Sequence, residues 1–120
     1  MIYITIGIVL ALLVICIEYE WWAKAKNKKR FHFIGFTSVF LVCMGIFYAF
    51  NWDLIVISII SLSYWNAFEL LGNHVHGQEW LYVGATANFD KQIRKFKNFK
   101  AVKLLMHIIS ILGILILTLL

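Results

Sequence analysis

Four long apolar runs, separated by polar or charged residues, make up more than half of the chain. Each run has 16 to 18 residues, close to the roughly 17–25 that a membrane-spanning helix needs. Hydrocarbon offers no hydrogen bonds to a free backbone, so each run is expected to be helical. The sequence predicts four transmembrane helices, at residues 2–17, 33–50, 54–71 and 104–120.

Tyrosine and tryptophan residues lie at the ends of these runs. Trp21 and Trp22 follow the first run, Trp52 lies between the second and third, and Trp65 lies toward the end of the third. Such amphipathic rings favour the headgroup level of a bilayer. The pattern indicates an all-α integral membrane protein with a single membrane domain over residues 1–120.

The second and third runs are joined by Asn51, Trp52 and Asp53 alone. So short a connection predicts a tight antiparallel helical hairpin. Asn51 and Asp53 are turn formers whose side chains can accept hydrogen bonds from the free N–H groups at the start of the third run.

The region between the third and fourth runs divides in two. Residues 72–87 contain three glycines and are expected to form a loop. Over residues 89–103, aromatic and aliphatic residues recur every three or four positions with Lys and Arg between them, which predicts a basic amphipathic helix at the membrane interface. The alternative is that the fourth span begins early, with a charged overhang.

Composition agrees with a membrane location. Hydrophobic residues make up 62% of the chain, against about 45–50% in soluble domains. All eleven Lys and Arg residues fall within residues 24–30 and 91–103. Because cytoplasmic loops collect basic residues, loops 18–32 and 72–103 are predicted to be cytoplasmic. Both termini of this multi-pass inner-membrane protein would then be non-cytoplasmic.

The second basic window is also the predicted contact with lipid. Its position beside the membrane favours anionic inner-leaflet lipids over nucleic acid as the partner. The basic residues of this window are Lys91, Arg94, Lys95, Lys97, Lys100 and Lys103.

Small residues spaced four apart predict close helix packing. Gly7 and Ala11 form one such pair in the first run, and Ser63 and Ala67 form another in the third. They are compatible with a packed bundle or with a homo-oligomer.

A polar cluster at the inner end of the third run is the candidate site. It comprises Glu69, Asn73, His74, His76 and Glu79, with Glu18, Glu20 and His32 expected at the same height. Imidazole and carboxylate groups are metal ligands or acid–base catalysts, and His74, His76 and Glu69 would be the ligands of a metal. No spacing here matches an established metal motif, so a solvated interfacial loop is favoured. No catalytic residue and no cofactor are predicted.

A pattern at the same place carries a family resemblance. The matching positions are Phe68 with Glu69, Asn73, Gly77, Trp80, Tyr82, Gly84 and Asp90. The segment resembles short uncharacterised polytopic membrane proteins encoded by bacteriophages and prophages, although their usual acid is Asp where this chain has Glu69. That group has no established activity, so the resemblance implies no catalytic residues.

The sequence is compatible with several functions. The first hypothesis is a non-enzymatic membrane protein that acts through helix contacts or oligomerisation. The alternatives are a holin-like protein that permeabilises the membrane and a metal-dependent membrane enzyme that uses the His/Glu cluster. A small multidrug carrier ranks last, because such carriers need a carboxylate within a span and Glu18 lies at the end of the first run.

Overall fold

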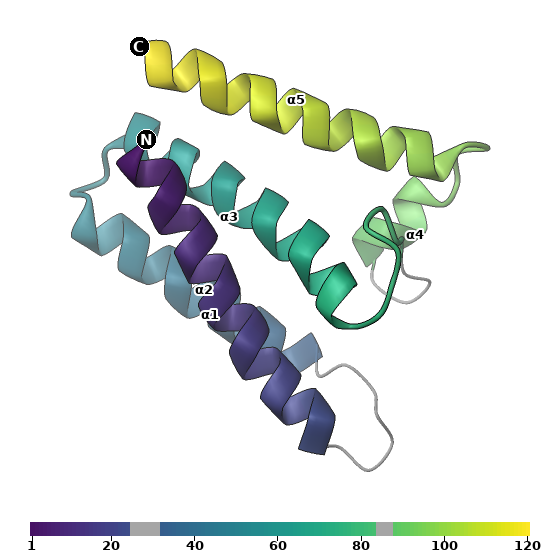
Figure 1. The fold of residues 1–120 in the computed structure, drawn as a ribbon. Coiled ribbons are helices and arrows are strands. Elements are labelled where there is room, and N and C mark those ends of the chain that lie inside the picture. Colours follow the sequence, from purple (N-terminus) through teal and green to yellow (C-terminus); the bar gives the residue numbers. More distant parts are fainter. Residues whose placement is uncertain (25–31, 84–87) are drawn as a thin grey trace.

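A computed structural model describes residues 1–24, 32–83 and 88–120, and all the regular structure in these ranges is helical (Figure 1). The prediction of an all-α protein is confirmed. In chain order the helices are α1 (Ile2–Lys24), α2 (His32–Ala49), α3 (Leu54–Val75), α4 (Asn88–Ile93) and α5 (Phe99–Leu119).

Two of these helices, α3 and α5, are long and apolar enough to cross a membrane. The apolar part of α1 is shorter and covers Ile2–Ile17, and the corresponding stretch in the described part of α2 is Phe40–Ala49. The helices begin within a few residues of the predicted runs. At their C-terminal ends, α1 and α3 continue beyond the predicted apolar runs, to Lys24 and Val75.

The predicted loop over residues 72–87 begins too early. Gly72 lies inside α3, which continues to Val75. Gly77, with φ of +72°, is the residue that ends the helix, because a residue in the left-handed region turns the chain out of the helix. The Gln78 N–H then donates to the Asn73 carbonyl at 2.8 Å and closes the turn.

The single amphipathic helix expected over residues 89–103 is also wrong. The segment forms the short helix α4, a turn over residues 94–98, and the first turn of α5. Asn98 caps α5 by accepting a hydrogen bond from the Ala101 N–H at 3.2 Å. Arg94 donates to the Val83 carbonyl at 2.6 Å, which ties the end of α4 to the preceding loop. The alternative of a fourth helix with a charged overhang describes the start of α5 correctly.

The closest helix pairing is between α1 and α3, which run in the same direction. Gly7 lies directly on α3: a Cβ atom at this position would lie 2.6 Å from the Ile60 carbonyl oxygen and 2.8 Å from the Ser63 Cβ. One turn further along, the buried Ala11 belongs to the cluster that includes Ala67. The small-residue pairs predicted to allow close approach therefore meet within this chain.

The hairpin between α2 and α3 is confirmed. Ile46 near the end of α2 packs against Ile57 near the start of α3, as expected for antiparallel neighbours. Asp53 caps α3 as predicted, accepting hydrogen bonds from the N–H groups of Ile55 and Val56 at 3.1 Å each. Asn51 has a different role, since it adopts a positive φ of 47° within the turn.

Helix α5 lies on the side of α3 that faces away from α1 and α2 (Figure 1). Within the described residues it packs directly against α3 and α4, but not against α1 or α2. It runs antiparallel to α3, so the chain termini lie at the same end of the molecule (Figure 1). The end that carries α4 and the loop after α3 is called the loop end below.

Candidate functional site

A buried cluster of charges joins three helices at the loop end. The Lys103 side chain of α5 is 1% exposed, and its Nζ lies 2.5 Å from Glu69 Oε2 on α3. Asp90 on α4 places its Oδ1 3.9 Å from the same nitrogen. Removing an ammonium group from water is costly unless it is paired and hydrogen-bonded, so the two carboxylates are what allow Lys103 to be buried.

One turn further along α5, a second polar group lies against α3. His107 is 3% exposed, and its Nδ1 lies 2.7 Å from Asn66 Oδ1. The Asn66 amide nitrogen donates to the Leu62 carbonyl at 2.8 Å and to Ser110 Oγ at 2.6 Å. Because these bonds fix the amide orientation, Oδ1 is the acceptor and His107 Nδ1 carries the donated proton.

The ring of His107 is also held from one side by an aromatic neighbour. It stacks on Trp65, with ring centroids 4.5 Å apart and an interplanar angle of 21°. Its second nitrogen, Nε2, is buried and has no hydrogen-bond partner within the described residues. The imidazole is therefore fixed in position by a stack and a single hydrogen bond.

The Lys103–Glu69 ion pair and the hydrogen bonds of His107, Asn66 and Ser110 together form a continuous polar seam between α3 and α5. It consists of Asn66 and Glu69 on α3 and of Lys103, His107 and Ser110 on α5. The α5 members lie at steps of four and three residues, which places them on one face of a helix. These hydrogen bonds and the ion pair join specific positions of α5 to specific positions of α3.

The sequence pattern indicates only part of this seam. Glu69 belongs to the polar cluster that the sequence predicts, whereas its partner Lys103 does not. Lys103 was assigned to lipid contact, but it is the one member of its basic window that is buried. The spacing of Lys103, His107 and Ser110 was the available signal, because charged and polar residues repeating on one face of an apolar helix indicate a buried contact.

The other members of the predicted cluster do not contact Glu69: Asn73 and His74 both contact Trp80, and Glu79 and His76 contact other residues. Asn73 donates to the Trp80 carbonyl at 3.1 Å, and His74 stacks on the Trp80 ring with centroids 4.4 Å apart. Glu79 forms an exposed ion pair with Lys100. His76 lies beside the ring of Tyr19, with centroids 6.3 Å apart.

The predicted metal ligands likewise do not converge. Glu69 is paired with Lys103, whereas His74 is stacked on Trp80. Among the described residues, no group of three His, Cys, Asp or Glu side chains is placed to hold a metal ion. The side chains of Glu18, Glu20 and His32 lie outside the described part of the structure.

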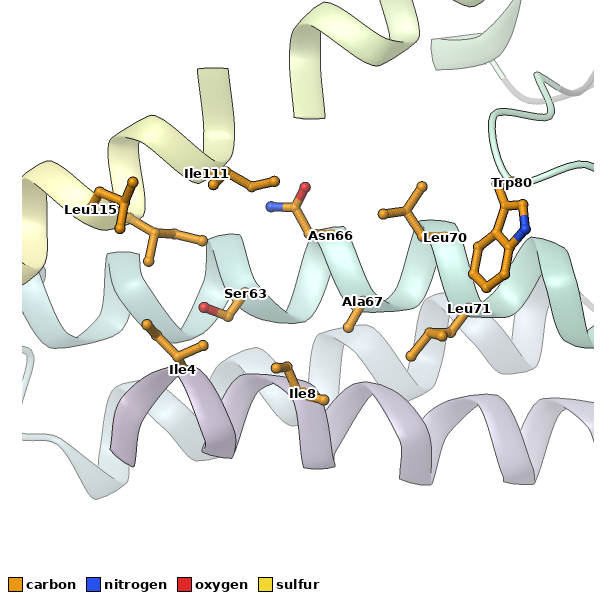
Figure 2. A pocket seen from close by; sticks show the side chains of 11 residues that line it. Ile4, Ile8, Ser63, Asn66, Ala67, Leu70, Leu71, Trp80, Ile111 and Leu115 are labelled. Atoms are coloured by element: carbon orange, nitrogen blue, oxygen red, sulfur yellow. The ribbon is translucent and has the colours of Figure 1, made fainter. Parts of the chain in front are cut away.

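Two cavities flank α3. The first, of about 360 Å³, is an apolar groove between α1 and α5 (Figure 2). Ile8 of α1 and Ile111 of α5 form its walls, Ser63 lies along its floor, and Trp80 stands at its loop end. The second, of about 290 Å³, lies between α2 and α3 and includes Glu69 in its lining. The Glu69 carboxylate therefore both pairs with Lys103 of α5 and lines this second cavity.

No family model, curated protein or solved structure matches the chain. Its class follows from the fold alone: a helical protein with two helices that are able to cross a membrane and a buried polar seam between them.

Proposed function

We propose that the chain is a non-enzymatic, four-span protein of the bacterial inner membrane that acts by associating with other membrane-embedded chains, including copies of itself. Helices α1, α2, α3 and α5 are the four spans. With the basic segments cytoplasmic, both termini lie on the opposite side. The placement of N- and C-termini at the same end of the molecule supports this arrangement (Figure 1).

The cytoplasmic surface in this proposal binds anionic lipid. Five basic residues in and after α4 are exposed. The aromatic residue Phe96, which lies between them in the sequence, is 58% exposed. Cations together with an exposed aromatic ring fit the headgroup region of an anionic leaflet. The five basic residues are Lys91, Arg94, Lys95, Lys97 and Lys100.

The observation that carries the association proposal is the outer face of α5. The polar groups of α5 are paired within the seam, and the opposite face of the helix is aliphatic. On that face the exposed fractions are 55% for Leu105, 60% for Ile109 and 62% for Ile116. Within the described residues α5 packs against α3 and α4 only. This leaves a long helix face available to a neighbouring span, where association depends on van der Waals packing.

Cysteine cross-linking tests this association directly. In a chain with Cys16 and Cys43 replaced by alanine, Ile109→Cys is expected to give a disulfide-linked dimer when membranes are oxidised. Ile114→Cys is the matched control, because Ile114 is only 7% exposed and faces the interior. Dimer formation is read by non-reducing electrophoresis.

Counting fluorophores by single-molecule photobleaching in bilayers provides the independent measurement. Two or more bleaching steps per spot are expected. A single step at every protein density, together with no cross-link from Ile109→Cys, would contradict the proposal.

A holin-like, permeabilising role is the second candidate function, and the length of the polar seam favours it. Separation of α5 from α3 would expose Glu69, Lys103 and His107, which are polar groups able to line a water-filled path. Induction in bacteria is then expected to collapse the membrane potential within minutes, as read with a voltage-sensitive dye. Growth with an intact potential at high membrane levels of the protein would exclude this role.

A further inference from the structure

The cavity between α2 and α3 combines aromatic rings with a carboxylate. On the α3 side it is lined by Tyr64, Trp65, Phe68 and Glu69, and on the α2 side it is closed by aliphatic residues and Cys43. The rings of Tyr64 and Phe68 are nearly parallel, with centroids 5.7 Å apart. Its volume of about 290 Å³ is at the lower end of ligand pockets, so a ligand would be small.

Glu69 is accessible from this cavity. Its side chain is 26% exposed, although its partner Lys103 is almost completely buried. Oε2 accepts the hydrogen bond from Lys103, and Oε1 has no hydrogen-bond partner within the described residues. One oxygen therefore anchors α5 while the carboxylate remains open to a second cation.

We propose that this cavity binds a small organic cation of the quaternary ammonium class. The faces of aromatic rings attract cations, and cages of such rings recognise quaternary ammonium groups. Glu69 supplies the opposite charge, and the apolar α2 wall accommodates the alkyl or aryl substituents of the ligand. This site is independent of association between chains.

Lys103 acts as a competitor for the same carboxylate. When a cation approaches Glu69, the repulsion between two positive charges favours movement of the Lys103 ammonium toward Asp90, whose Oδ1 is already 3.9 Å away. Removal of the Lys103 charge is therefore expected to strengthen binding. A purely structural role for the ion pair predicts no such gain.

The test is equilibrium dialysis of radiolabelled benzyltrimethylammonium against the full chain in lipid nanodiscs, with empty nanodiscs as the blank. Saturable binding of one cation per chain is expected. Neopentylbenzene, the neutral carbon isostere, is expected not to displace it, because the isostere lacks the charge that Glu69 and the rings recognise.

Variants separate the roles of the two charges. Lys103→Met is expected to tighten binding about tenfold, and the double variant Glu69→Gln/Lys103→Met to weaken it at least about tenfold relative to the unmodified chain. The double variant removes both members of the closest ion pair, so it tests the carboxylate without leaving the Lys103 charge buried beside a neutral side chain at position 69. Circular dichroism and a monodisperse elution profile check that this variant folds.

The matched control is Glu79→Gln, which removes a carboxylate that is 70% exposed and lies outside the cavity. Its cation affinity should equal that of the unmodified chain. Absence of saturable binding, equal displacement by neopentylbenzene, or undiminished affinity in the double variant would each overturn the proposal.

Discussion

Replacement of Gly7 by alanine is expected to lower the free energy of unfolding by about 1–3 kcal/mol, the usual cost of an extra methyl group in a closely packed contact. The added Cβ would lie 2.6 Å from the Ile60 carbonyl oxygen and 2.9 Å from the Tyr64 nitrogen. Both are backbone atoms, so they cannot move aside as a flexible side chain would. The helices α1 and α3 would have to separate, which weakens the closest pairing in the molecule.

Gly45→Ala is the matched control for this change. Gly45 also lies in an apolar helix, but a Cβ atom there meets nothing within 4 Å. Unfolding in mixed micelles of increasing SDS content, followed by circular dichroism, should show a loss for Gly7→Ala and none for Gly45→Ala. Equal behaviour of the two variants would mean that the α1–α3 contact does not limit stability.

Glu69→Gln should have a larger effect, a loss of about 3 kcal/mol or more. Breaking a buried ion pair by removing one partner typically costs about 3–5 kcal/mol, because the other charge stays buried without compensation. Here Lys103 would lose its partner at 2.5 Å, while Asp90 remains 3.9 Å away. Because the Asp90 carboxylate still compensates part of the Lys103 charge, the expected loss lies toward the lower end of that range.

The double variant Glu69→Gln/Lys103→Met should recover most of this loss, because an uncharged pair leaves no buried ion. Glu79→Gln, which disrupts an exposed pair with Lys100, should leave unfolding in the same SDS titration unchanged within error. If the double variant is as unstable as Glu69→Gln alone, the cost does not arise from the unpaired Lys103 charge.

The helices themselves follow from local features of the sequence. The apolar runs give the positions of α1, α2, α3 and α5 to within a few residues at their apolar ends. Asp53 was identified as a cap because a short polar side chain before an apolar run accepts bonds from nearby N–H groups. The spacing of Gly7 and Ala11 predicts a face that allows backbones to approach, and the structure shows that α3 is the helix that lies on it.

Errors in the prediction lie where two signals of similar strength compete. Gly72 looked like the end of a helix, yet Gly77 provides the positive φ that ends it. The basic segment after residue 88 has helical periodicity throughout, but the Asn98 cap and the contact of Arg94 with Val83 divide it. Capping and side-chain bonds to a distant carbonyl outweigh periodicity in such a short, charged stretch.

The sequence by itself determined the helical class, the apolar runs and the hairpin turn, since each depends on residues close together in the chain. Only the tertiary structure decided that Lys103 pairs with Glu69 and Asp90, and that His107 meets Asn66. These partners are separated by 13 to 41 residues. Which charge is buried depends on which face of α5 meets α3, and that packing is a property of the whole fold.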